Sequence, residues 1–305
     1  MTADPRVRVE VVARLAPFAV VAAFLAFLAA GCGGSSSSSA SDTTTTGASC
    51  DKADLNLVKA GTLTIGTDNP AYPPWFGGTA KSPWKVSYPP SGQGFESAVA
   101  TAVATNLGFA SKEVNWIVVP FNTSFAPGPK KFDFDINEIS FTPARAKVVD
   151  FSSSYYDVNQ AIVGLKGQPI AKATSTADLK PYKLGAQLGT TSYDYIVKKI
   201  KPSQKPAVFD TNDAAVQSLK NKQIDGLVVD LPTAFYVTAA QVPNSTIIGQ
   251  FPTSGTPEHF GMVLAKGNSL TKCIDGALAD LRASGTLAHI QQKWLAKAAG
   301  APVLK

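Results

Sequence analysis

Several polar residues that could recognise a small charged molecule follow predicted strands. Arg145 stands in a turn, Asp68 and Asp230 end strands, and Gly189-Thr190-Thr191 begins a helix. A guanidinium can bind a carboxylate through two parallel hydrogen bonds, and the free N–H groups of a helix start suit an anion. An anion site beside a carboxylate matches a zwitterion. We therefore expect Arg145 and Thr191 to hold the α-carboxylate of an amino acid and Asp230 to hold its α-ammonium group.

The composition argues against metal and nucleic-acid chemistry. Three cysteines and two histidines show neither CxxC nor HxxxH spacing, so we predict no zinc site and expect no metal or cofactor. The 305 residues carry 28 basic and 22 acidic side chains, a net charge of +6 that is spread along the chain. Nucleic-acid binding needs a clustered basic face, so this mild surplus does not indicate a nucleic-acid partner.

Alternating strands and helices must position the polar residues. The β-branched run 62–67 predicts a strand that ends at Asp68, and apolar residues at i+4 spacing predict a helix over 94–108. Further strands are expected over 115–119, 132–139, 183–188, 224–230 and 260–265. Further helices are expected over 191–200, 213–221 and 269–299, the first capped by Thr190, the second by Asp213 and the last broken near Gly285. This alternation predicts an α/β protein with parallel sheets covered on both faces and ligand sites at the carboxyl ends of the strands.

A structural role is an alternative for several of these residues. Arg145 could form a surface ion pair, Asp68 could cap a turn with its own side chain, and Asp230 could cap the next helix. Because Thr190 is the expected N-cap of its helix, Thr191 is the better ligand candidate of the two threonines.

The N-terminal segment has the composition of an export signal. Three arginines precede the uncharged run 15–30, which at 16 residues is short for a membrane span. Leu28-Ala29-Ala30-Gly31-Cys32 then resembles a bacterial lipoprotein signal, although its leucine stands four residues before the cysteine and not the usual three. We expect residues 1–31 to be removed as a signal peptide and Cys32 to carry a lipid that anchors the chain to the cell membrane.

An extracytoplasmic location bears on the other two cysteines. The Gly-, Ser- and Thr-rich stretch 33–47 has the composition of a flexible spacer, so residues 32–54 are expected to tether the folded part to the anchor. Cys50 and Cys273 then remain. Outside the cytoplasm such a pair is more often a disulfide than two free thiols, so we expect them to be joined.

Six motifs occur in series along residues 55–298. They are Gly66-Thr67-Asp68 with Tyr72-Pro73-Pro74-Trp75, Ile139-Ser140-Phe141-Thr142-Pro143-Ala144-Arg145 with Val149-Asp150-Phe151-Ser152, Leu188-Gly189-Thr190-Thr191, Ile224-Asp225-Gly226-Leu227-Val228-Val229-Asp230, Phe260-Gly261-Met262, and Gly285-Thr286-Leu287 with Lys293-Trp294. One such motif alone is weak evidence, but six in the same order are strong. Together they resemble the extracellular solute-binding proteins of polar amino-acid ABC transporters, family three.

The resemblance implies a periplasmic-binding-protein-like (type II) Venus flytrap with two hinge crossings. Residues 55–158 and 257–305 would form lobe 1, and residues 159–256 would form lobe 2. Such a protein captures a polar amino acid outside the cytoplasm and delivers it to a membrane permease driven by a cytoplasmic ATPase. We expect a monomer.

The resemblance also assigns roles in the ligand site. In this family the arginine that matches Arg145 grips the ligand carboxylate, helped by the positions of Ser140 and of Thr191 in the Gly-Thr-Thr start. The aspartate that matches Asp230 holds the amino group from the opposite lobe, so that ligand draws the lobes together. The aromatic residues expected to cover the ligand side chain, or to form a plain hydrophobic wall, are Tyr72 and Trp75.

Two stretches depart from the family pattern, and both are expected on the pocket side of lobe 1. A Gly- and Pro-rich insertion, 77–92, replaces a short hairpin, and Asn137-Glu138 replaces two small residues. Glu138 and Asp68 near the ligand side chain would favour a guanidinium or ammonium group and reject an acidic ligand. Alternatively, Glu138 pairs with a basic residue or faces solvent, which leaves a neutral pocket for a ligand such as glutamine.

Two other classes compete with a transport protein. A dehydratase of prephenate-like acids resembles this family, and Glu138 could then act as an acid or base. A sensor of this type should continue into a transmembrane helix and a signalling module, whereas the chain ends at Lys305. We expect a binding protein and not an enzyme.

Overall fold

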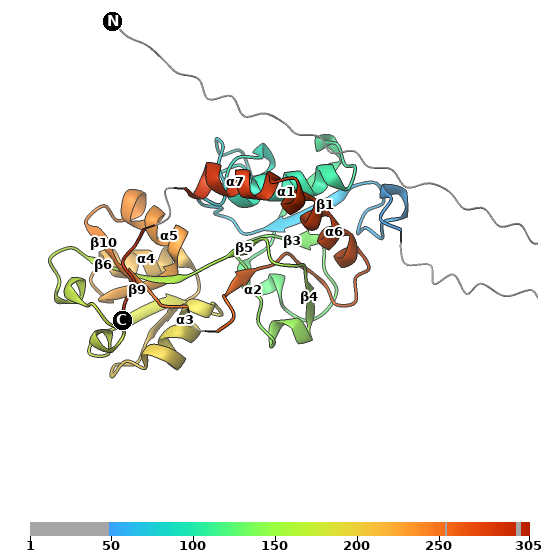
Figure 1. Ribbon diagram of the computed structural model, residues 1–305. Coiled ribbons are helices and arrows are strands. Elements are labelled where there is room, and N and C mark those ends of the chain that lie inside the picture. Colours follow the sequence, from blue (N-terminus) through green and yellow to red (C-terminus); the bar gives the residue numbers. More distant parts are fainter. Residues whose placement is uncertain (1–48, 254, 297–299) are drawn as a thin grey trace, which may run out of the picture. The chain divides into compact units, whose positions relative to one another are not determined.

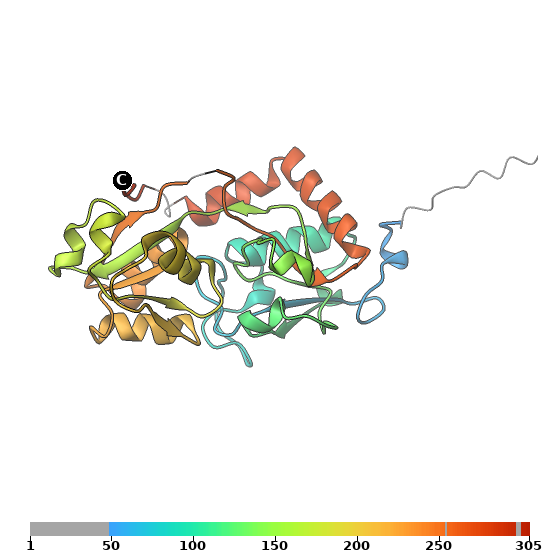
Figure 2. The same ribbon diagram turned by 90° about the horizontal axis from the view of Figure 1, so that it is seen from below.

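The computed structural model describes residues 49–253, 255–296 and 300–305, which contain two five-stranded sheets (Figures 1 and 2). Sheet 1 contains β1 (Leu63–Thr67), β2 (Val114–Val118), β3 (Phe134–Asp135), β4 (Val149–Phe151) and β12 (Val263–Ala265), in the order β2-β1-β3-β12-β4. Sheet 2 contains β6 (Gln160–Leu165), β7 (Leu184–Gln187), β8 (Ala207–Phe209), β9 (Gly226–Asp230) and β10 (Ser245–Gln250), in the order β10-β6-β9-β7-β8. Cys32 and the predicted signal peptide lie outside the described residues.

Each sheet carries its own helices. Sheet 1 packs with α1 (Phe95–Asn106), α6 (Leu270–Ala283) and α7 (Thr286–Leu295), and we call this part lobe 1. Sheet 2 packs with α3 (Thr191–Tyr195), α4 (Asn212–Lys220) and α5 (Leu231–Tyr236), and we call this part lobe 2. The described chain also contains short helices, among them α2 (Phe121–Ser124) and the 3₁₀ turn η4 (Arg145–Lys147). The segments η7 (Ile196–Ile200) and η8 (Val237–Gln241) are π-helical. No helix in the described ranges is both long and apolar enough to cross a membrane.

The expectation of purely parallel sheets is wrong, because both sheets are mixed. β1 runs parallel to β2 and β3, but β12 runs antiparallel to β3 and β4. In sheet 2, β7 is parallel to β8 and β9, whereas β6 is antiparallel to both β9 and β10. The antiparallel strands β6 and β12 are the ones that follow the passages between the sheets, where no crossover helix precedes them.

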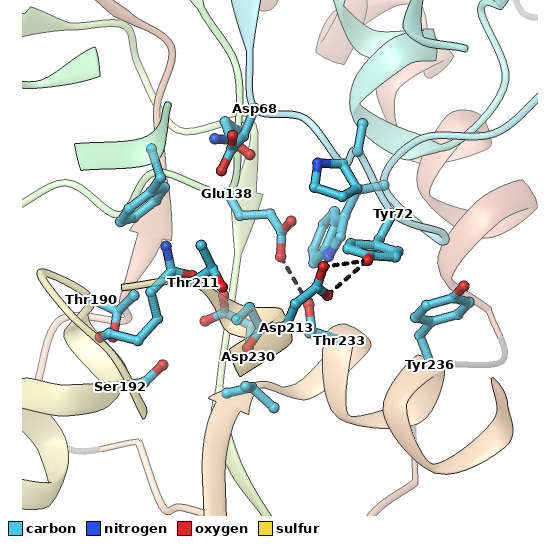
Figure 3. A pocket seen from close by; sticks show the side chains of 18 of the residues that line it. Asp68, Tyr72, Glu138, Thr190, Ser192, Thr211, Asp213, Asp230, Thr233 and Tyr236 are labelled. Atoms are coloured by element: carbon cyan, nitrogen blue, oxygen red, sulfur yellow. Dashed lines mark hydrogen bonds between the residues drawn. The ribbon is translucent and has the colours of Figure 1, made fainter. Parts of the chain in front are cut away.

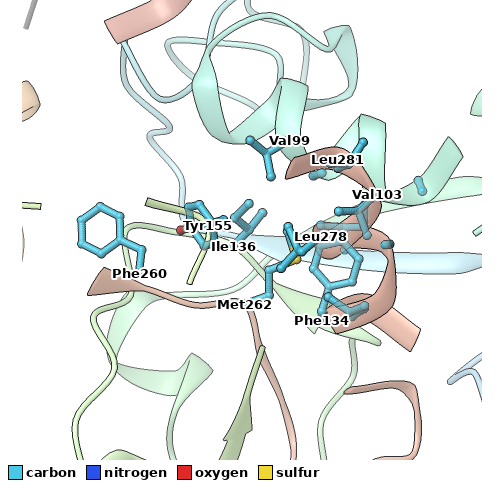
Figure 4. Close-up of a cluster of buried hydrophobic side chains, with 14 of the residues drawn as sticks. Val99, Val103, Phe134, Ile136, Tyr155, Phe260, Met262, Leu278 and Leu281 are labelled. Carbon is cyan, nitrogen blue, oxygen red and sulfur yellow. The ribbon is translucent and has the colours of Figure 1, made fainter. Parts of the chain in front are cut away.

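The core of lobe 1 forms between α1, α6 and sheet 1 (Figure 4). Phe95, Val99 and Val103 lie one turn apart on α1 and are fully buried, as their spacing predicts. Figure 4 shows Val99 and Val103 close to Leu278 and Leu281 of α6. Gly285 has a φ of 74° and separates α6 from α7, which confirms the predicted break in this helical stretch.

Lobe 2 buries both faces of sheet 2. Ala161, Val163 and Leu165 of β6 belong to one apolar cluster, and Ile162 belongs to another on the opposite face. Alternate strand residues point to opposite faces, so burial of both explains why β6 is an unbroken apolar run.

The two sheets are connected at β5 (Tyr156–Asp157) and β11 (His259–Phe260), which pair with each other in antiparallel fashion. β5 stands in the chain between β4 of sheet 1 and β6 of sheet 2. β11 stands between β10 of sheet 2 and β12 of sheet 1. This short ribbon holds together the two passages that the resemblance implied.

The last residues do not lie where we expected them. The backbone N–H groups of Gln250 and Leu304 pair with the carbonyls of Pro302 and Gln250, at 2.8 and 2.9 Å. Leu304 is 2% exposed and packs with Ile162 and Phe251. The tail therefore belongs with sheet 2 and not with lobe 1, because its leucine fills an apolar site beside β10. The other residue limits of the lobes remain a prediction.

A disulfide joins Cys50 to Cys273, whose Cα atoms are 5.4 Å apart across 223 residues of sequence. Cys273 lies on α6 in the lobe 1 core, whereas Cys50 lies at the start of the described chain. The bond therefore attaches the beginning of the folded part to the C-terminal helical region.

Candidate functional site

A cavity of about 160 Å³ lies between residues of the two lobes (Figure 3). All nine residues that sequence reasoning assigned to ligand line it: Asp68, Tyr72, Trp75, Glu138, Ser140, Arg145, Thr190, Thr191 and Asp230. They converge because the ends of β1, β7 and β9 and the turn after β3 all face this space. The insertion 77–92 does not line the cavity. It contacts lining residues instead: Asn69 bonds to Pro83 and Lys85, and the carbonyl of Phe76 accepts from the hydroxyl of Ser87 over 3.1 Å.

Arg145 is buried and not part of a surface ion pair. Its side chain is 9% exposed, and its guanidinium donates to the carbonyls of Ser140 at 2.6 Å and Gly189 at 2.7 Å. The guanidinium carbon lies 4.1 Å from the ring centre of Phe125, and burial lowers the pKa of Arg145 to about 10. Two of the five N–H donors are used by these carbonyls, so the fork still has donors for a carboxylate.

Ser140 and Thr191 are hydrogen-bonded to Glu258, a residue that sequence reasoning missed. Both hydroxyls donate to Glu258 Oε1, each over 2.6 Å, and Gln160 donates to the same oxygen over 3.2 Å. Glu258 directly precedes β11, outside every motif that pointed to a strand end. Since each hydroxyl has one proton, a ligand carboxylate would compete with Glu258 for these donors.

Thr190 is the N-cap of α3, as predicted. Its Oγ1 accepts from the backbone N–H of Tyr193 over 3.1 Å and donates to the carbonyl of Gln187 over 2.7 Å. The hydroxyl group is therefore engaged in local structure, which leaves Thr191 as the better ligand candidate.

Asp230 occupies the N-cap position of α5, but its side chain makes no capping hydrogen bond. Its carboxylate accepts instead from the side-chain amide of Gln160, on the neighbouring strand β6. Burial first, and the charge of Glu258 next, raise the pKa of Asp230 well above its ordinary value. A cation beside Asp230 would relieve both effects.

Glu138 points into the cavity and has no basic partner within the described ranges. Its Oε2 accepts from the hydroxyl of Thr233 over 2.8 Å, across the two lobes. Its φ of 53° lies in the left-handed region, which costs energy for a residue other than glycine. The buried Glu96 holds this conformation by accepting the backbone N–H of Glu138 over 2.6 Å. Burial first, and the charges of Glu96 and Asp230 next, raise the pKa of Glu138 well above its ordinary value.

Asp68 and Asp213 bring two more carboxylates to the cavity. Asp68 accepts from the backbone N–H of Asn69 over 2.7 Å, and burial raises its pKa. Asp213 does not cap α4, because Thr211 accepts the N–H of Ala214 in that role. Its carboxylate accepts instead from the hydroxyl of Tyr72, which comes from lobe 1 (Figure 3).

Trp75 forms part of the apolar wall. Its ring meets Phe95, Tyr156 and Phe260 edge to face, at centroid distances of 5.5 to 5.9 Å. The indole N–H donates over 2.8 Å to Thr233 of lobe 2. Trp75 is 1% exposed, so it supports the cavity more than it offers free surface to a ligand.

The cavity has an excess of carboxylates. Four acidic side chains line it, Asp68, Glu138, Asp213 and Asp230, against a single basic one, Arg145. No salt bridge of the described residues involves any of the four. No group of three or more metal-binding side chains occurs there either. The arrangement can bind one carboxylate and more than one cationic group.

The chain is similar to known proteins over most of its length. The family model of bacterial extracellular solute-binding proteins, family 3, matches residues 63–297. The L-cystine-binding protein of Escherichia coli (strain K12) is 28% identical over 261 residues, which are 84% of this chain and 89% of that protein.

Solved structures give the same result. An ancestral arginine-binding protein bound to arginine has a TM-score of 0.62 at 33% identity and covers 77% of this chain and 98% of its own. An ancestral amino acid-binding protein described as a precursor of cyclohexadienyl dehydratase has a TM-score of 0.62 at 28% identity, covering 77% of this chain and 95% of its own. With the family model matched over most of its length, the chain belongs to the bacterial extracellular solute-binding proteins of family 3.

Proposed function

We propose that this solute-binding protein captures an amino acid with a cationic side chain and delivers it to an ABC permease in the cytoplasmic membrane. The excess of carboxylates in the cavity carries the proposal: four acids face one arginine, and no described cation pairs with them. Unpaired charges are costly to bury, so the site favours a ligand that brings two positive groups and one negative group.

Each charge of such a ligand has a partner in the cavity. The guanidinium of Arg145 takes the α-carboxylate, because it is the only cation among the described lining residues. Asp230 takes the α-ammonium group from lobe 2. The side chain then extends toward Asp68 and Glu138, both on lobe 1. A glutamate side chain would meet these carboxylates with the same sign of charge, and glutamine would leave them without a cation.

A thermal-shift screen of the twenty amino acids and polyamines tests this proposal. A ligand at 100 times its Kd adds roughly 2.7 kcal/mol to the free energy of unfolding, so arginine, lysine or both should raise the melting temperature. Glutamate should not. A shift from glutamine alone would favour the neutral pocket, and a shift from glutamate would contradict the proposed site.

An enzymatic function is the second candidate. Its support is the similarity to the precursor of a dehydratase, together with a cavity carboxyl, Glu138, whose pKa is raised. An acid with a raised pKa can donate a proton near neutral pH. Incubation of the purified protein with prephenate distinguishes the two: product formation supports the enzyme, and saturable amino-acid binding without turnover supports the transport protein.

We also propose that the protein works outside the cytoplasm while anchored through a lipid on Cys32. The motif before Cys32 and the Ser- and Thr-rich stretch behind it support the anchor. A tether keeps the protein near the permease and so raises its effective concentration there.

A further inference from the structure

One carboxylate of the cavity has no role in the proposed amino-acid contacts. Asp213 lies in the first turn of α4 and lines the cavity with its neighbours Thr211 and Asn212. We propose that Asp213 determines specificity by binding the positive tip of the ligand side chain from lobe 2. This inference rests on the proposed function and extends it to a residue outside the family motifs.

The bonding of Asp213 leaves it free to accept more hydrogen bonds. Its two carboxylate oxygens lie 2.7 and 2.8 Å from the hydroxyl of Tyr72, which has one proton to donate. No described salt bridge neutralises the carboxylate. An ionised carboxylate has about four lone-pair sites, so a guanidinium or ammonium group can bind beside Tyr72 without displacing it.

Two aromatic rings stand next to this carboxylate. The rings of Tyr72 and Tyr236 are 5.8 Å apart and inclined by 40°, and both line the cavity (Figure 3). Their pKa values are raised by burial and by the negative charge of Asp213, so both phenols stay neutral. Neutral aromatic faces attract a guanidinium or ammonium group more strongly than an uncharged amide.

Asp213 comes from a different lobe than the two other acids expected near the side chain of the ligand. Asp68 and Glu138 belong to lobe 1, whereas Asp213 belongs to lobe 2. Asp68 and Asp213 line the same cavity, and the charge of Asp213 adds to burial, the larger cause, in raising the pKa of Asp68. A cation in this region would be attracted by both lobes at once. Its charge would therefore help to hold the lobes together around the ligand.

Arginine and its neutral isostere citrulline test the proposal. Calorimetry on the wild-type protein and on Asp213→Asn gives two dissociation constants for each protein. In wild type, citrulline should bind more weakly than arginine. Asp213→Asn should weaken arginine binding about tenfold to a hundredfold, the range for a hydrogen bond to a charged group, and should change citrulline binding little. The ratio of the citrulline dissociation constant to the arginine dissociation constant then falls.

Two further variants separate charge recognition from lobe contact. Asp210→Asn removes the same charge from an exposed residue that does not line the cavity, and it should leave the ratio unchanged. Tyr72→Phe removes the hydrogen bond between the lobes but keeps the Asp213 carboxylate. It should weaken both ligands by a similar factor and preserve the ratio.

The outcomes are distinguishable. If wild type does not prefer arginine to citrulline, the proposed preference for a cationic ligand fails. If wild type prefers arginine but Asp213→Asn weakens both ligands equally, Asp213 only links the lobes and the present inference alone is overturned. A fall in the ratio that Asp210→Asn reproduces would also overturn it, because the effect would then come from net charge.

Discussion

At the scale of single residues, the account rests on a small number of charge contacts. Arg145→Ala and Asp230→Ala should each weaken amino-acid binding by tens to thousands of fold, since loss of one partner of a buried charge pair costs about 2 to 5 kcal/mol. Lys147→Ala is the matched control, because Lys147 is exposed and two residues from Arg145. Isothermal titration calorimetry measures the effect, with circular dichroism to show that the variants fold. Affinity near that of wild type in both variants would remove the proposed site.

Nine of the lining residues could be predicted because ligand sites of α/β sheets lie at strand ends, and the motifs marked those ends. Two acidic residues of the site were missed because their side chains make contacts across the lobes. Asp213 looked like a helix cap, yet Thr211 takes that position and Asp213 turns to Tyr72 of the other lobe. Glu258 follows no strand and precedes β11, so no spacing pointed to its bonds with Ser140 and Thr191. Only three-dimensional proximity reveals such pairs.

At the scale of elements, the disulfide between Cys50 and Cys273 should stabilise the fold. In the chain-entropy model, closing a loop of this length contributes on the order of 5 kcal/mol, because it restricts the unfolded chain. Urea unfolding of the protein with and without a reductant should show the difference in midpoint. Peptide mapping under non-reducing conditions should recover the linked pair, and two freely alkylated thiols would contradict the bond.

The elements themselves were predicted unevenly. The i+4 spacing predicted a helix over 94–108, and α1 spans Phe95–Asn106. A strand was expected over 132–139, but β3 has two residues, because the chain then turns toward the cavity at Asn137-Glu138. Periodicity also carries no information on strand direction, so the antiparallel strands β6 and β12 could not be foreseen from it.

At the scale of the whole molecule, buried carboxyl groups should make stability depend on pH. Glu96 has a pKa raised from 4.5 to about 7, first by burial. Between these values Glu96 binds a proton in the folded state more often than in the unfolded state. The contribution of Glu96 to the free energy of unfolding should therefore fall as pH rises from 4.5 to about 7, and it should change no further above. This shift in the pKa of Glu96 corresponds to a change in the free energy of unfolding on the order of 3 kcal/mol.

Glu96→Gln tests the origin of this pH dependence. Oε1 of Glu96 accepts both the Tyr155 hydroxyl and the Glu138 backbone N–H, whereas Oε2 has no partner. A glutamine can keep the accepting oxygen, so the variant should fold. Urea unfolding at a series of pH values should give a flatter profile than that of wild type. An unchanged profile would assign the effect to other groups.

The membrane anchor gives a further prediction for the whole chain. Cys32→Ser removes the thiol that would carry the lipid, so the protein should move from the membrane fraction to the soluble extracytoplasmic fraction. Ser39→Ala is the control, since it changes a residue of the stretch 33–47 but leaves Cys32 and both disulfide cysteines in place. Fractionation followed by immunoblotting measures both. A Cys32→Ser protein that stays with the membrane would contradict the anchor.

The most direct test of the central claim is calorimetric titration of the purified protein with L-arginine, L-lysine, L-glutamine and L-glutamate at pH 7. The account predicts saturable one-to-one binding of arginine, lysine or both, weaker binding of glutamine, and no binding of glutamate. Tight binding of glutamate, or no binding of any of the four, would contradict it.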